Sequence, residues 1–160
     1  KFNVGDAYDP GNHYQSYYYF RFAAIDKGGV PDMSSSHITV PSNGFIRIWS
    51  LEGFELSQRV LGLFGGISDL GLKGLQLIHS PSIDPGFKGA LALGIRNLTS
   101  EDVELTRAER IGKLLLFDVT ECSGQSTITT PDALHGEKQE QRDHARRVIL
   151  AALGGRIQKL

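Results

Sequence analysis

Short apolar runs separated by glycine-bearing turns fill the chain from residue 14 to about residue 119, and this pattern constrains the fold more than any other feature. The segment ALALGIRNL is typical: Leu91, Leu93 and Ile95 alternate with other residues and are expected on one face of a half-buried strand. Many such strands joined by tight turns predict a β sandwich or barrel. The 19 glycines among 160 residues fit the same interpretation.

The expected strands follow one another at short intervals. In the segment 37–56, Pro41, Asn43 and Gly44 predict a turn between two strands. The segments with strand character are YQSYYYFRFAAI (14–25), the two runs of HITVPSNGFIRIWSLEGFEL (37–56), RVLGLFGG (59–66), KGLQLI (73–78), ALALGIRNL (90–98), EDVEL (101–105) and IGKLLLFDV (111–119).

The character of the chain changes after Val119. A polar, turn-like stretch is followed by a segment rich in Glu, Gln, Arg and Ala, which predicts a helix over 131–153 ending at a pair of glycines. Apolar residues recur at helical spacing in its last turns and form one face, which needs a partner. That partner is the β body, another subunit or a domain outside this chain. We therefore divide the chain into a β domain (1–122) and a linker with a C-terminal helix (123–160).

Composition excludes several classes of partner. A formal net charge of −1 and a pI of about 6.6 create no field that would attract nucleic acid or an anionic membrane. Cys122 is the single cysteine, so no internal disulfide can form, and this fits a reducing, cytoplasmic location. We expect no zinc site, because no Cys/His cluster has the required spacing, and no apolar run is long enough to span a membrane.

A series of motifs resembles the dUTPase and dCTP deaminase superfamily. The matching segments are YYYFRF (17–22), PSNGFIRIWSLEGFEL (41–56), GISDLGLKGLQLI (66–78), SIDPGFKGALALGIRN (82–97) and VELTRAERIGKLLLFDV (103–119). The IDPG element in this context is the most specific of them. The resemblance implies a mainly β fold, the distorted jelly-roll barrel of the dUTPase type (β-clip), here with a C-terminal α-helix. It also implies a homotrimer with sites between the subunits.

The resemblance carries some functional residues over to this chain. Asp84 matches the acid of the third motif, which is associated with activating the attacking water. Ser68 stands at the serine of the second motif, and Lys113 replaces the glutamine of the fourth; both are candidates for contacting phosphate groups. Phe87 follows the IDPG turn, where an aromatic ring can stack on a deoxyribose. The catalytic candidate is therefore Asp84, and the nucleotide-binding candidates are Ser68, Phe87 and Lys113.

Other positions depart from the family pattern. The glutamate that shuttles protons in the deaminases falls on Gly94, so we expect no deamination. The arginine of the second motif falls on Ile67, beside an added acid at Asp69 that opposes phosphate binding. The aspartate of the first motif falls on Tyr18 or Tyr19, and a phenol cannot replace a carboxylate on Mg²⁺. We assign no metal ligand, and Mg²⁺ is expected only if the protein hydrolyses nucleotides.

Structural roles explain some of the same residues. An aspartate before Pro-Gly suits a tight hairpin because its side chain can cap nearby backbone donors, and we favour this role for Asp84. Phe87 can equally cover the mouth of the barrel. His79 lies close to the IDPG turn and is a further candidate for a general base.

Two functional hypotheses remain. The preferred one is a catalytically degenerate family member that acts as a trimeric binding, regulatory or assembly module, with a possible docking partner at the C-terminal helix. The alternative is a divergent dUTP or dNTP pyrophosphatase of nucleotide metabolism that uses Asp84 and Mg²⁺, with Ser68 and Lys113 touching phosphates. Both allow a dNTP or dUTP ligand, and neither involves nucleic acid or a membrane.

Overall fold

The computed structural model describes residues 2–3, 9–14, 17–120 and 133–152 of the chain, with the side chains of residues 9–14, 17–120 and 140–152. The strands are β1 (Phe2–Asn3), β2 (Tyr17–Lys27), β3 (Val30–Asp32), β4 (His37–Val40), β5 (Phe45–Leu56), β6 (Val60–Gly66), β7 (Leu75–Ile78), β8 (Ser82–Ile83), β9 (Lys88–Asn97), β10 (Val103–Thr106) and β11 (Arg110–Asp118). The helices are a 3₁₀ turn (Pro10–Asn12), α1 (Ser68–Leu72) and α2 (Ala133–Ala152).

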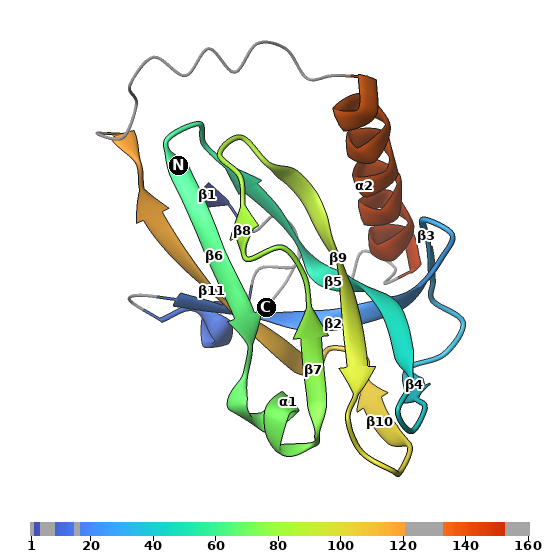
Figure 1. Cartoon of the computed structure of the whole chain (residues 1–160). Coiled ribbons are helices and arrows are strands. Elements are labelled where there is room, and N and C mark those ends of the chain that lie inside the picture. The colour runs from blue at the N-terminus through green and yellow to red at the C-terminus, as the bar shows by residue number, and fades with distance from the viewer. Residues whose placement is uncertain (1, 4–8, 15–16, 121–132, 153–160) are drawn as a thin grey trace.

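One curled antiparallel sheet forms the body of the protein, with the order β7-β9-β5-β2-β11-β6-β8 (Figure 1). β1 joins this sheet beside β5, β3 joins it beside β2, and β4 pairs separately with β10. The mainly β fold with a C-terminal helix is therefore confirmed, as are the expected strand segments. The short strands β1, β3 and β8, the 3₁₀ turn and the helix α1 were not predicted.

The concave side of the curled sheet holds the main hydrophobic core. Tyr18 and Phe20 of β2 point into it with at most 1% of their surface exposed. Leu91, Leu93 and Ile95 of β9 are also buried there, as their alternation predicts. Burying side chains of this size stabilises the fold by about 2 kcal/mol each, before the entropy of ordering them is subtracted.

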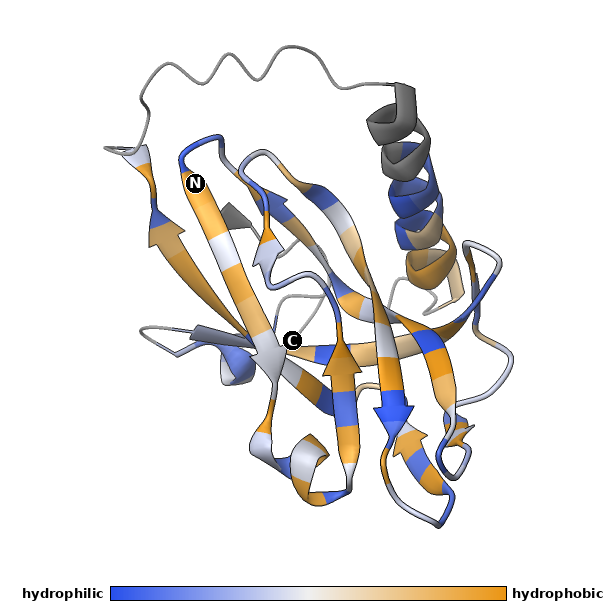
Figure 2. Ribbon diagram, in the orientation of Figure 1, coloured by the Kyte–Doolittle hydropathy of each residue, from blue (hydrophilic) through white to orange (hydrophobic). Residues whose placement is uncertain are grey.

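Helix α2 packs on the outer surface of the same sheet, across β9 and beside β3 (Figure 1). Ala145 and Ile149 lie in a second cluster with Trp49, Leu51 and Ala90, and all five are buried. Figure 2 shows the apolar colour of α2 concentrated in its last turns, where these contacts are made. Of the partners left open for the apolar face of the helix, the β body is thus the one that its buried residues contact.

A different outer surface of the sheet is only partly covered by the described residues. We call it the outer β11 face and define it by Tyr17, Leu61, Leu63, Leu115 and Phe117. Leu115 stands opposite Tyr17 on one neighbouring strand and opposite Leu63 on the other. Leu63, Leu115 and Phe117 are 38%, 38% and 44% exposed, and β6 and β11 are rich in apolar residues (Figure 2).

The proposed boundary between residues 122 and 123 lies outside the described residues, so the division into two parts stays a prediction. Within the described part of the chain, no helix is long and apolar enough to cross a membrane.

Candidate functional site

The IDPG segment forms a turn that its backbone alone holds together. The amide of Phe87 donates to the main-chain carbonyl of Asp84 at 3.1 Å, with Pro85 and Gly86 at the two central positions. Gly86 has a φ of 81°, which the third residue of a type II turn requires and which side chains oppose. The turn is tied to the preceding loop because the Gly86 amide donates to the carbonyl of Ser57.

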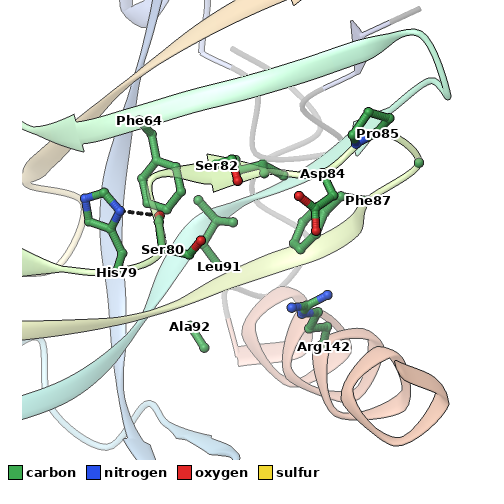
Figure 3. A pocket seen from close by; sticks show the side chains of 12 residues that line it. Phe64, His79, Ser80, Ser82, Asp84, Pro85, Phe87, Leu91, Ala92 and Arg142 are labelled. Carbon is green, nitrogen blue, oxygen red and sulfur yellow. Dashed lines mark hydrogen bonds between the residues drawn. The ribbon is translucent and has the colours of Figure 1, made fainter. Parts of the chain in front are cut away.

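The carboxylate of Asp84 takes no part in this turn. Within the described part of the chain it accepts no hydrogen bond and forms no ion pair, and the residue is exposed. The expected capping of backbone donors is therefore wrong: the main-chain carbonyl makes the turn instead. The carboxylate lies at a pocket of about 310 Å³ beside the turn, which we call the hairpin pocket (Figure 3).

Arg142 of α2 contributes a cation to the hairpin pocket. Its guanidinium carbon lies 4.6 Å from the centre of the Phe87 ring, within the range of a cation–π contact. Partial burial lowers the pKa of Arg142, and the nearby charge of Asp84 opposes this effect. The helix can approach so closely because Gly89 has no side chain: a Cβ there would lie 2.8 Å from the Cβ of Arg142.

Aromatic and hydroxyl groups line the other end of the hairpin pocket. The His79 ring stacks on Phe64 with centroids 4.1 Å apart, and its Nδ1 is placed to donate to the carbonyl of Ser80. That donation leaves Nε2 as the acceptor of the ring, which a general base requires. The structure thus places His79 and Asp84 in one pocket, together with Phe87.

Ser68 and Lys113 lie in a second pocket, of about 260 Å³, which also contains Tyr19, Asp69 and Arg110. The ammonium group of Lys113 sits 4.3 Å from the ring centre of Tyr17 and 5.4 Å from that of Tyr19. We call this the Lys113 pocket. The four predicted site residues are therefore brought together in two pairs. Asp84 and Phe87 line the hairpin pocket, Ser68 and Lys113 line the Lys113 pocket, and the two pockets share no lining residue.

The first-motif region contains carboxylates, but they serve a structural ion pair. Glu52 is completely buried and accepts hydrogen bonds from both the backbone amide and Nε of Arg21, each at 2.7 Å. Arg21 also forms an ion pair with Asp9 at 3.4 Å. Tyr18 fills the core, where burial raises the pKa of its phenol to about 12. Tyrosines occupy the positions of the family's aspartate, so this donor set does not fit Mg²⁺.

Gly94 lies on β9, and the space for a side chain there is already occupied. A Cβ on Gly94 would be 2.4 Å from Cε2 of Phe45 and 3.3 Å from Cβ of Ile78. Phe45 stands opposite Arg96 in the register of β5 and β9, so its ring reaches diagonally over Gly94. A glutamate at this position would require the Phe45 ring to move.

The fold and the IDPG hairpin together define a protein of the dUTPase and dCTP deaminase class. Comparison with known proteins leads to the same class. A family model described as dCTP deaminase-like matches residues 25–119. The chain belongs to this dCTP deaminase-like family.

Curated relatives include dUMP-forming dCTP deaminases of two corynebacteria. The protein of Corynebacterium diphtheriae is 32% identical over 110 residues, which are 62% of this chain and 58% of the relative. The protein of Corynebacterium glutamicum strain R is 36% identical over 78 residues, which are 48% of this chain and 41% of the relative. The chain thus spans about half the length of these curated relatives.

Solved structures share the fold at low sequence identity. The dCTP deaminase of Agrobacterium tumefaciens superimposes with a TM-score of 0.59 at 12% identity, covering 72% of this chain and 43% of that chain. The dUTPase of Staphylococcus bacteriophage 80alpha superimposes with a TM-score of 0.52 at 15% identity, covering 82% and 84%.

Proposed function

We propose that this protein is a catalytically degenerate member of the dCTP deaminase-like family that acts as a binding, regulatory or assembly module. The observation that carries the proposal is that glycine, Gly94, stands where the deaminases have their glutamate. Gly94 supplies no proton-transferring group, and the ring of Phe45 fills the space where one would stand.

The acid beside the phosphate-binding candidates supports the same conclusion, whereas their separation from Asp84 within one chain does not, because a homotrimer can form its sites between subunits. Hydrolysis of a phosphate chain needs a positioned base and a charge clamp acting on one substrate. Asp84 lines the hairpin pocket, whereas Ser68 and Lys113 line the Lys113 pocket. Asp69 adds a negative charge to the second pocket, which weakens its attraction for phosphate.

Self-assembly is the property that we propose has survived. The outer β11 face presents Leu63, Leu115 and Phe117 together, and contiguous apolar surface of this kind marks interaction sites. We propose a homotrimer in the cytoplasm, built through this face. The proposal assigns to this chain neither the activity of the curated dCTP deaminases nor that of the solved dUTPases, which share its fold.

Turnover measurements test the proposal directly. The protein is incubated with each dNTP and with dUTP in the presence of Mg²⁺, and release of ammonia and of pyrophosphate is followed. We expect neither product above the rate without protein. Ammonia release from dCTP, or pyrophosphate release that Asp84→Asn abolishes, would overturn the degenerate function.

A second candidate function rests on the carboxylate of Asp84. This group is exposed at the hairpin pocket and is not consumed by the turn, so it is available to take a proton from an attacking water. His79 in the same pocket offers a second acceptor. The protein would then be a divergent dUTP or dNTP pyrophosphatase, with Mg²⁺ entering on the phosphates of its substrate.

The two candidates differ in one measurement. A hydrolase loses pyrophosphate release in Asp84→Asn, with the rate falling at least about 100-fold for a lost general base. His79→Gln serves as a comparison, because a base at that position would be revealed by the same loss. If the wild-type protein shows no turnover, the hydrolase is excluded.

A further inference from the structure

Another pocket, of about 410 Å³, lies between α2 and the turn that joins β2 to β3 (Figure 1). We call it the α2 pocket. None of its lining residues also lines the hairpin pocket or the Lys113 pocket. Its volume falls within the range of sites that take small molecules. The side chains that line it have no role in the proposed function.

The turn between β2 and β3 forms one wall of the α2 pocket with its main chain. Gly28 and Gly29 have φ values of 66° and 90°, as the two central residues of a type I′ hairpin require. The Gly29 amide donates to the buried carboxylate of Asp26 at 2.7 Å, which ties the turn to the sheet. Because neither glycine has a side chain, a ligand can approach the backbone of the turn. Val30, 45% exposed, adds an apolar surface beside it.

Helix α2 forms the opposite wall with side chains of one face. Glu140, His144 and Arg147 line the pocket at intervals of four and three residues, so they follow one another along the helix. Gln141 brings this face close to the turn, because a Cβ on Gly29 would lie 3.6 Å from its side-chain amide. Glu140 and Arg147 have their Cα atoms about 10 Å apart along the helix axis. One end of this wall therefore has a carboxylate and the other end has a guanidinium.

These charged groups are not used by the fold. Within the described residues, Glu140, His144 and Arg147 form no ion pair, hydrogen bond or ring contact. Side chains pair along a helix when they are three or four residues apart, which excludes a direct pair between Glu140 and Arg147. Both groups are therefore available to a ligand that reaches the two ends of the pocket.

We propose that the α2 pocket binds an extended zwitterion, namely an ω-amino carboxylate with an ammonium group at one end, a carboxylate at the other and an aliphatic chain between them. Arg147 donates to the carboxylate of the ligand, and Glu140 accepts from its ammonium group. The aliphatic chain lies along Val30. His144 lies between the two ends, where its ring nitrogens can donate to the carboxylate or accept from the ammonium group.

The balance of charges favours this class of ligand. One carboxylate and one guanidinium attract a molecule that has both charges and no net charge. A polyanion such as a nucleoside triphosphate is repelled by Glu140, and a polyamine is repelled by Arg147. The two charges of glycine are too close together to reach both groups.

The inference goes beyond the proposed function, because it concerns a separate site and requires neither catalysis nor its loss. It also depends on α2, which lies outside the family-matched residues 25–119. Turnover of a dNTP would defeat the degenerate function and leave this site standing. Absence of zwitterion binding would defeat this site and leave the degenerate function standing.

NMR titration of the full, ¹⁵N-labelled chain with 6-aminohexanoate tests the site. We expect saturable changes in the amide shifts of Gly28 and Gly29, with no change at Gly86 of the hairpin. Hexanoate and hexylamine each keep one charged end. Each should bind at least about fivefold more weakly, because one charge-assisted hydrogen bond at an exposed site is lost. Glycine, whose charges are close together, should cause no saturable change.

Glu140→Gln and Arg147→Gln each remove one charge from the pocket. Each should lower the affinity for 6-aminohexanoate about fivefold. Glu140→Gln should leave the affinity for hexanoate unchanged, and Arg147→Gln should leave that for hexylamine unchanged. The matched controls are Glu104→Gln on β10 and Arg96→Gln on β9, because both residues are exposed and line no part of the α2 pocket. Circular dichroism of each variant confirms that α2 is retained.

Unchanged amide shifts of Gly28 and Gly29 in about 50 mM 6-aminohexanoate would overturn the inference and leave this face of α2 as a solvated surface. Equal affinities for 6-aminohexanoate, hexanoate and hexylamine would also overturn it. Tighter binding of inorganic pyrophosphate would do the same, because it would reveal an anion site. Equal losses in Arg147→Gln and Arg96→Gln at about 0.15 M salt would reveal only long-range attraction and would count against the site.

Discussion

The carboxyl group of Glu52 is fully buried beside Arg21, and we expect this residue to make the free energy of unfolding depend on pH. Burial raises the pKa of Glu52 to about 7, well above its ordinary value of 4.5, although Arg21 acts in the opposite direction. A raised pKa in the folded state means that the folded protein holds this proton more tightly than the unfolded chain. Its contribution to stability is therefore complete below pH 4.5 and is lost as the pH rises through 7.

We predict that Glu52→Gln removes this pH dependence. The wild-type free energy of unfolding, minus that of the variant, should fall by on the order of 3 kcal/mol between about pH 4.5 and pH 8, since charging the buried group costs the folded state. Urea denaturation at several pH values measures the difference, and groups common to both proteins cancel. Glu104→Gln, at an exposed glutamate of β10 that forms no ion pair within the described part of the chain, should give a flat difference. A flat difference for Glu52→Gln as well would contradict the prediction.

Restoring the deaminase glutamate at Gly94 should not restore activity. Gly94→Glu must displace the Phe45 ring, so we expect a loss of stability of about 1 to 3 kcal/mol and no ammonia release from dCTP. Adding Phe45→Ala opens the space, and the two changes together should cost less than their sum. Gly65→Ala is the control, because no atom lies within 4 Å of a Cβ there. Strictly additive costs in urea denaturation would argue against the steric conflict.

At the scale of elements, helix α2 covers the only tryptophan of the chain, which therefore reports on the docking of the helix. Trp49 is 2% exposed and lies in the cluster that contains Ile149. We predict that Ile149→Asp releases α2 and shifts the Trp49 fluorescence to longer wavelength, while far-UV circular dichroism still shows the sheet. Gln141→Asp, exposed on the same helix, should leave the emission unchanged. An unshifted emission in Ile149→Asp would mean that α2 does not depend on this contact.

The sequence predicted the elements well because their signals are local. Alternation located β9, and helical spacing located α2 with Ala145 and Ile149 on its buried face. The motif pattern also identified Asp84 and Phe87 as neighbours in one site. These features depend on residues close together in the chain, which periodicity and turn chemistry can detect.

The rest of the site could not be predicted because it depends on contacts between distant segments. Arg142 reaches the hairpin pocket only through the packing of α2, and nothing in its own surroundings in the sequence distinguishes it from Arg146 or Arg147. The unused carboxylate of Asp84 is equally invisible in the sequence, because a turn aspartate usually caps its own loop. Asp84 and Lys113 line different pockets, which the motif pattern by itself does not show.

At the scale of the whole molecule, we propose that the outer β11 face determines whether the protein forms oligomers. Tyr17, Leu63 and Leu115 lie side by side on three neighbouring strands, and Leu63 and Leu115 are each 38% exposed, whereas Tyr14 stacks on the Tyr17 ring. Three copies that each bury such a face would remove apolar surface from water, at about 25 cal/mol per Å². We therefore predict a trimer at micromolar concentration, measurable by sedimentation equilibrium.

Leu115→Asp should convert this trimer to monomers, because burying an unpaired charge in each interface costs several kcal/mol. The control is Ile78→Asp on β7, which has similar exposure, 42% against 38%, but lies outside the outer β11 face. It should leave the mass unchanged. A wild-type monomer would remove the trimer from the proposed function. A trimer that survives Leu115→Asp but not Ile78→Asp would move the interface to the β7 edge, next to Phe45 and Gly94, and would make that edge the assembly surface.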